Sequence, residues 1–138
     1  MSGTLLDTSV WVRYFRPGGD EALKAEVSRL LALGEVFTCW VVKAELLVGT
    51  RDEGAFDRLL SALEGLPEVE LTAGVWESAA RLGHRLRRLG ISIPLPDLLI
   101  AGAALSADLE LWHTDEDFER VKAAAPLKTR FFPAEAGG

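Results

Sequence analysis

Four acidic residues each interrupt or border an apolar segment of the chain. They are Asp7, Glu45, Asp97 and Asp115. Carboxylates gathered at one place repel one another, and a hard divalent cation such as Mg²⁺, which binds a few carboxylates together with water and substrate phosphate, removes that repulsion. A bound cation also polarises a phosphoryl oxygen and lowers the pKa of its water. The four acids therefore indicate metal-dependent hydrolysis of a phosphodiester bond.

Each acid also has a purely structural explanation. Asp97 and Asp115 stand where a helix N-cap is expected, and a capping carboxylate needs no further role. Glu45 lies inside a predicted helix and can point into solvent. Asp7 can cap the helix that follows it, but its neighbours Thr8 and Ser9 can do the same, so this role explains Asp7 least well.

The elements that must position these acids alternate along the chain. Strand-like patterns occupy residues 4–6, 36–38, 68–72, 109–112 and 128–132. Helical patterns occupy residues 9–16, 20–34, 41–48, 53–63, 75–89, 98–105 and 115–124. Pro94 and Pro96 predict an extended entry to the helix that Asp97 opens. Strands separated by helices favour a parallel sheet with helices on both faces, in which strand-end acids meet at one edge.

Composition limits the class of protein. The chain has 138 residues, which suits one domain, and its formal net charge of −6 argues against a generic nucleic-acid coat or a membrane-surface protein. A single cysteine, Cys39, excludes an internal disulfide and is interpreted as a buried hydrophobe. No apolar run is long enough to span a membrane and no signal peptide is evident. We expect a cytoplasmic protein with one domain over residues 1–133 and a flexible tail over 134–138.

Four segments in order along the chain resemble those of the PIN-domain nucleases, and most closely the VapC-type ribonuclease toxins of type II toxin–antitoxin modules. The segments are Leu5-Leu6-Asp7-Thr8-Ser9-Val10-Trp11, Ala44-Glu45-Leu46-Leu47-Val48-Gly49, Pro96-Asp97-Leu98-Leu99-Ile100-Ala101-Gly102-Ala103-Ala104 and Thr114-Asp115-Glu116-Asp117-Phe118. The resemblance implies a three-layer α/β/α fold with a parallel five-stranded sheet of order 3-2-1-4-5. Its switch in strand order lies between the first and fourth strands, beside Asp7 and Asp115.

The resemblance also assigns roles to the acids. It implies that Asp7, Glu45, Asp97 and Asp115 bind Mg²⁺ or Mn²⁺ and catalyse cleavage of RNA by an activated water, with Asp117 as a ligand of second rank. It further implies that Ser9 or Thr8 hydrogen-bonds a ligand carboxylate. The chain departs from many relatives at one position, because His113 stands where they have threonine, two residues before Asp115. Both histidines, His84 and His113, are interpreted as non-catalytic.

The expected partners are an RNA substrate, a small antitoxin protein and a second copy of the chain, with no membrane contact. Arg13 and an arginine face on the helix over 75–89, made by Arg81, Arg85 and Arg88, are candidates for contacting RNA phosphates. Such a face is also typical of a solvated outer helix. The alternative function is a non-catalytic RNA- or protein-binding module that keeps the same fold.

Overall fold

The structure is a computed structural model and describes residues 3–133. Its strands are β1 (Thr4–Leu6), β2 (Val36–Phe37), β3 (Glu110–His113) and β4 (Thr129–Phe131). Its helices are α1 (Thr8–Phe15), α2 (Glu21–Ala32), α3 (Trp40–Val48), α4 (Glu53–Glu64), α5 (Ala73–Arg88), α6 (Leu95–Ala107) and α7 (Glu116–Val121). The predicted tail over 134–138 lies outside the described residues.

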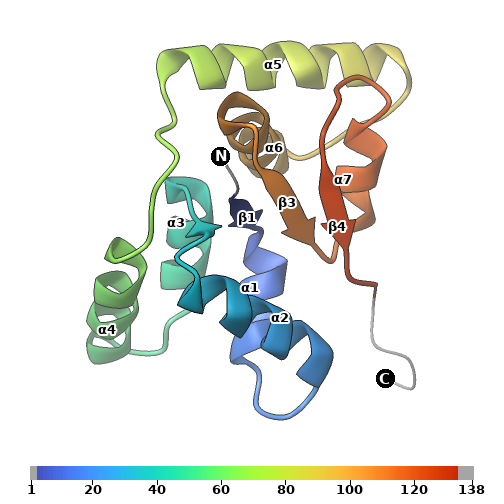
Figure 1. The fold of residues 1–138 in the computed structure, drawn as a ribbon. Coiled ribbons are helices and arrows are strands. Elements are labelled where there is room, and N and C mark those ends of the chain that lie inside the picture. Colours follow the sequence, from blue (N-terminus) through green and yellow to red (C-terminus); the bar gives the residue numbers. More distant parts are fainter. Residues whose placement is uncertain (1–2, 134–138) are drawn as a thin grey trace.

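The strands form one parallel sheet of order β2-β1-β3-β4. In the register of the central pair, Leu6 lies opposite Trp112, and Trp112 lies opposite Arg130 of β4. Helices α1 and α2 cover one face of the sheet, and α5 and α6 cover the other (Figure 1). The predicted α/β class and parallel sheet are confirmed, and strand order reverses between β1 and β3, as expected.

The predicted third strand, over 68–72, is absent, because this segment forms only a single bridge between Glu68 and Thr38, and the sheet of the described residues has four strands instead of five. The N–H of Thr38 donates to the carbonyl of Pro67 at 3.0 Å, and the N–H of Val69 donates to the carbonyl of Thr38 at 2.8 Å. Pairing stops there because the chain turns into α3 at Trp40 immediately after Thr38 and Cys39. The segment still lies beside β2, where the outermost strand was expected.

The predicted extended entry over 94–96 is also wrong. Helix α6 begins at Leu95, with Pro94 as its N-cap and Pro96 in its first turn. Proline is tolerated there because the first N–H groups of a helix have no intrahelical acceptor. Asp97 is consequently inside the first turn and does not cap α6, so its capping interpretation is wrong as well.

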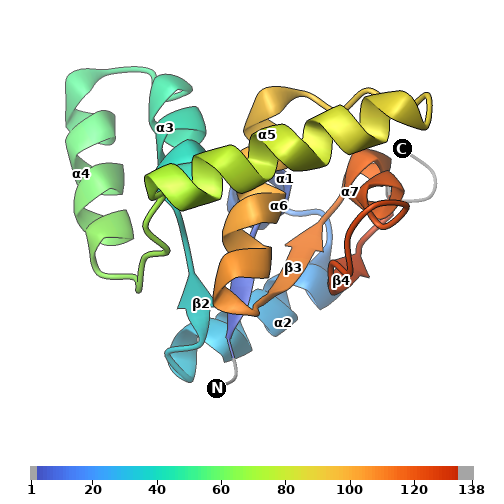
Figure 2. The same cartoon turned by 90° about the horizontal axis from the view of Figure 1, so that it is seen from above.

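The core is built around the sheet and α6. Leu5, Leu6 and Leu111 are fully buried, and every residue of α6 from 98 to 104 is buried. Helix α5 crosses α6 and packs against it, as the view from above shows (Figure 2). This packing fixes α6, and with it Asp97, relative to the strand ends. Among the described residues, no helix has the length and apolar character needed to cross a membrane.

Candidate active site

Asp7 lies between the end of β1 and the start of α1. Its carboxylate caps α1, because the N–H of Ser9 donates to Oδ2 at 3.0 Å and the Ser9 hydroxyl donates to the same oxygen. Only 5% of Asp7 is exposed to solvent. Burial raises the pKa of Asp7, hydrogen bonds from Ser9 lower it, and the negative charge of Glu45 raises it again. Asp7 is therefore both a helix cap and a buried acid facing a second acid.

Glu45 reaches the same region from α3. The hydroxyl of Thr8, the first residue of α1, donates to Oε1 of Glu45 at 2.6 Å. Glu45 is solvent-exposed, but this bond and its electrostatic effect on Asp7 place its carboxylate beside the buried acid. The interpretation of Glu45 as a residue pointing only into solvent does not fit this contact.

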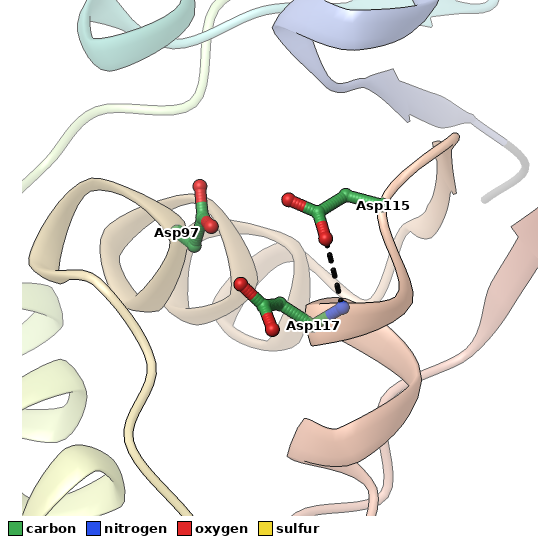
Figure 3. Close-up of side chains that lie close together, drawn as sticks. All are labelled: Asp97, Asp115 and Asp117. Atoms are coloured by element: carbon green, nitrogen blue, oxygen red, sulfur yellow. Dashed lines mark hydrogen bonds between the residues drawn. The ribbon is translucent and has the colours of Figure 1, made fainter.

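Asp115 and Asp117 lie at the start of α7, just beyond β3. Oδ1 of Asp115 accepts the N–H of Asp117 at 2.9 Å, so Asp115 caps α7 as one sequence interpretation expected. Capping does not remove it from the acid cluster. One ligand atom from each of Asp97, Asp115 and Asp117 lies within 4.8 Å of the others, and their carboxylates converge (Figure 3).

Asp97 is the residue whose pKa is influenced by the negative charges of all the other acids. Its pKa is raised to about 7, first by burial and then by the negative charges of four other acids. Those acids are Asp7, Asp115, Asp117 and Glu45. The five carboxylates come from four separate parts of the chain. Those of Asp97, Asp115 and Asp117 converge closely, whereas Asp7 and Glu45 are not part of this group of three and act on Asp97 through their negative charges.

The donor set suits a hard divalent cation. All five side chains offer carboxylate oxygens, the ligands that Mg²⁺ and Mn²⁺ prefer. Their mutual repulsion, seen in the raised pKa of Asp97, is relieved by a positive charge among them. Thr8 and Ser9 hold two of the carboxylates in place by hydrogen bonds, as expected of groups that orient metal ligands.

The basic residues predicted to contact RNA have other partners or lie elsewhere. Arg13 donates to the carbonyls of Phe132 at 3.3 Å and Pro133 at 2.9 Å, and only 11% of its side chain is exposed. Arg81 pairs with Glu77 on its own helix at 2.9 Å. Arg13 therefore ties α1 to the chain after β4, which gives it a structural role, while the contact of these arginines with RNA stays a prediction.

Arg85 and Arg88 line cavities that contain none of the five acids. Arg85 borders a cavity of about 580 Å³ between α5, α6 and the turn after α7. Arg85 and Arg88 together border a smaller one of about 300 Å³ beside Ala123 and Ala124. Neither of these two cavities contains one of the five acids. The metal-binding chemistry of the carboxylates favours the acid cluster as the site.

His113, which the sequence singled out only as a departure from relatives, contacts the turn that carries Asp115, and its partner Glu119 was not predicted. His113 is fully buried, and its Nδ1 lies 3.2 Å from the backbone nitrogen of Asp115. Its Nε2 lies 2.7 Å from Oε2 of Glu119 in α7. The signal in the sequence was the histidine in place of threonine at this position.

Comparisons with known proteins agree with this geometry. A model of the PIN domain family matches residues 4–124. The VapC ribonuclease Mb1587 of Mycobacterium bovis is 30% identical over 138 aligned residues, which cover 93% of this chain and 98% of that protein. Ribonuclease VapC51 of Mycobacterium tuberculosis is 33% identical over 129 residues, covering 86% of this chain and 85% of the relative.

Solved structures show the same fold. VapBC2 from Rickettsia felis, bound to a DNA fragment from its promoter, superposes with a TM-score of 0.75 at 19% identity, over 94% of this chain and 98% of the other. VapC20 of Mycobacterium tuberculosis, a Sarcin-Ricin loop cleaving toxin, gives a TM-score of 0.63 at 19% identity, over 85% and 93%. The family match and these relatives confirm the resemblance seen in the sequence, and the chain belongs to the PIN domain family.

Proposed function

We propose that this protein is a metal-dependent endoribonuclease that hydrolyses RNA phosphodiester bonds, and that it is the toxin of a toxin–antitoxin pair. The observation that carries the proposal is the convergence of the Asp97, Asp115 and Asp117 carboxylates. The negative charges of Asp7 and Glu45 also contribute to raising the pKa of Asp97 to about 7. Membership of the PIN family and the ribonuclease relatives support the choice of RNA as substrate.

The residues of the proposed site have different roles. When bound, Mg²⁺ or Mn²⁺ polarises a phosphoryl oxygen and lowers the pKa of a water molecule. Asp7, Glu45, Asp97 and Asp115 would hold the ion, with Asp117 as an additional ligand. Thr8 orients Glu45 and Ser9 orients Asp7. A cation held among these carboxylates would favour the deprotonated form of Asp97.

The proposed partners follow from the same relatives. Solved neighbours include a toxin–antitoxin complex from Klebsiella pneumoniae and VapBC-5 of Mycobacterium tuberculosis, a member of the VapBC family of toxin–antitoxin systems. We propose that a small antitoxin binds this chain and covers the acid cluster, which is complementary to a basic side chain. A homodimer and a cytoplasmic location belong to the same proposal.

The test compares RNA cleavage by the wild type and by Asp7→Asn, with Mg²⁺ or Mn²⁺ present or chelated. Asparagine is as good an N-cap as aspartate, so α1 keeps its start while the site loses a charged ligand. We expect the wild type to cut RNA only with metal and Asp7→Asn to be about 100-fold slower or worse. Asp57→Asn, on an exposed position of α4, makes the same charge change away from the acids and serves as the control.

Two results would contradict the proposal. Cleavage retained by Asp7→Asn, when the same purification from cells that lack the expressed protein yields no nuclease, would reject the site. RNA binding without metal and without cleavage by the wild type would favour the binding-module alternative. Mapping new RNA 5′ ends in cells that express each variant then identifies the RNA and the position of the cut.

A further inference from the structure

The imidazole ring of His113 is held in one orientation by its surroundings. It is fully buried at the end of β3. The ring of Phe131 stacks on it with centroids 5.1 Å apart and planes 12° apart, and the ring of Phe118 packs against it at 5.1 Å with a 54° tilt. Contact with two aromatic rings leaves the two nitrogens pointing in fixed directions.

Those directions determine which nitrogen carries the proton. The backbone N–H of Asp115 points at Nδ1, so Nδ1 must accept. Nε2 faces Oε2 of Glu119, and a carboxylate only accepts, so Nε2 must donate. Only the neutral Nε2–H tautomer satisfies both contacts, because a proton on Nδ1 would face the N–H of Asp115.

Glu119 is itself firmly held. The hydroxyl of Thr129 in β4 donates to Oε2 at 2.6 Å, and the Lys122 ammonium donates to Oε1 at 2.8 Å. Both carboxylate oxygens of Glu119 therefore accept from donors on other residues, and Oε2 is directed at Nε2 of His113 as an acceptor.

The turn between β3 and α7 is thus fixed at three points. His113 accepts the N–H of Asp115, Asp115 caps α7 through Asp117, and Ser9 accepts the N–H of Thr114 at 3.1 Å. Ser9 also donates to Asp7. The backbone of Asp115 is consequently positioned by His113 from one side and by the Asp7 turn from the other.

We propose that His113 is a positioning residue, which fixes the Asp115 carboxylate in the metal site by accepting its backbone N–H, and that Glu119 selects the ring tautomer that can do so. The inference rests on the metal-dependent nuclease proposed above. It gives a role to the histidine that stands where many relatives have threonine.

The test separates the hydrogen bond from the packing by two substitutions. His113→Leu keeps a buried apolar side chain of similar bulk but has no acceptor. His113→Asn packs less well, yet its Oδ1 lies where Nδ1 lies and can accept the N–H of Asp115. Mn²⁺ affinity is measured by calorimetry on each purified variant, and unfolding is followed to compare stability.

We expect His113→Leu to bind Mn²⁺ about 10–100-fold more weakly than the wild type, the cost typical of losing a group that orients a metal ligand. His113→Asn should recover most of this affinity while being the less stable of the two. If the ring served only packing, His113→Leu would bind Mn²⁺ more tightly than His113→Asn. With RNA, the Leu variant should lose kcat more than it changes KM.

Tautomer selection by Glu119 is tested without changing the ring. Imidazole ¹⁵N shifts of the wild type should show an unprotonated Nδ1 and a protonated Nε2. Glu119→Gln should give mixed tautomers and weaken Mn²⁺ binding several-fold, whereas Glu116→Gln, an exposed charge-matched control on α7, should leave the tautomer unchanged. If His113→Leu does not fold, the proposal is still tested by the ¹⁵N shifts of the wild type and by the comparison of Glu119→Gln with Glu116→Gln.

A protonated Nδ1 in the wild type overturns the proposal. The positioning role of His113 is also overturned if His113→Leu binds Mn²⁺ as tightly as the wild type. If both proteins then cleave RNA, the proposed nuclease function is still supported. Weaker Mn²⁺ binding by the Leu variant with no RNA cleavage by the wild type supports the positioning role and rejects the nuclease. No Mn²⁺ binding by the wild type overturns both.

Discussion

Asp97 carries the clearest sign of function at the scale of single residues. A carboxylate in the first turn of a helix is normally stabilised by the helix dipole. In α6 the opposite holds, because burial and four neighbouring acids raise the pKa of Asp97 to about 7. The free energy stored in this arrangement opposes folding of the metal-free protein, and no structural advantage compensates for it.

Asp97→Asn should therefore stabilise the metal-free protein at neutral pH. The folded-state pKa of about 7 exceeds the ordinary aspartate pKa of 3.8, so the folded state binds the extra proton, and the free energy of unfolding falls as pH rises from about 4 to about 7. The variant should gain on the order of 2 kcal/mol over the wild type at pH 8, after discounting for solvent, and nothing at pH 4.

Urea unfolding in chelator at a series of pH values measures this difference. Asp57→Asn, the exposed control, should follow the wild type at every pH. Parallel stability curves for Asp97→Asn and the wild type would mean that the acids do not repel one another as the structure indicates.

The sequence identified all five acids, but it could not choose between capping and ligation. Asp7 and Asp115 each cap a helix, and the negative charge of each also raises the pKa of Asp97, so capping does not exclude the predicted ligand role. For Asp97 the capping interpretation failed because Leu95 and Pro96 entered the helix. The contacts of His113 were not predictable, since they depend on Glu119 and Phe131, which only the folded sheet brings close.

At the scale of elements, the site depends on how closely α5 packs on α6. A Cβ built on Gly83 of α5 would lie 2.5 Å from Cδ1 of Leu98 in α6, so glycine permits the close approach. Leu98 is buried and directly follows Asp97. A shift of α6 away from α5 would therefore also displace an acid of the cluster.

Two glycine-to-alanine substitutions in α5 should have opposite effects. Gly74→Ala meets nothing closer than the Thr72 hydroxyl oxygen at 3.6 Å and should stabilise the protein by up to about 1 kcal/mol through helix propensity. Gly83→Ala gains the same propensity but forces Leu98 to move, and overpacking of a core costs about 1–3 kcal/mol. Gly83→Ala should thus be the less stable variant by about that amount in chemical denaturation.

The sequence predicted the helices more accurately than it predicted the outer edge of the sheet. Periodicity in α5 and the apolar run of α6 located both helices, because each buries a face along its length. The segment over 68–72 shows the alternation of a strand, but β2 is too short to pair with it beyond a single bridge. Lys43 explains how the segment is still held, since its buried ammonium pairs with Glu68 and lies 4.0 Å from the Trp40 ring centroid.

At the scale of the whole molecule, metal and proton compete for the same acids. The chain has a formal net charge of −6, and five of its carboxylates are gathered at one end of the sheet. A cation that binds only the folded state stabilises it by mass action. Because bound ligands must be deprotonated, this stabilisation depends on pH.

Mn²⁺ at about a hundredfold excess over its Kd should raise the Tm of the wild type by about 10 °C at pH 8, the effect of roughly 2.7 kcal/mol on a domain of this size. The rise should be smaller at pH 5.5, where Asp97 holds its proton, and smaller in Asp97→Asn at either pH. Thermal unfolding followed by circular dichroism measures it. An equal rise in the variant would show that the ion binds elsewhere.

The double use of Asp7 and Asp115 as helix caps bears on how such a nuclease loses activity in evolution. Asparagine preserves each cap and removes each charge, so one substitution yields a well-folded, inactive protein that can still occupy a binding partner. Alanine or a bulky residue loses the cap as well, which costs about 0.5–2 kcal/mol of stability. Inactive descendants of this chain are therefore expected to persist as binding proteins when the change is to asparagine, and to disappear by degradation otherwise.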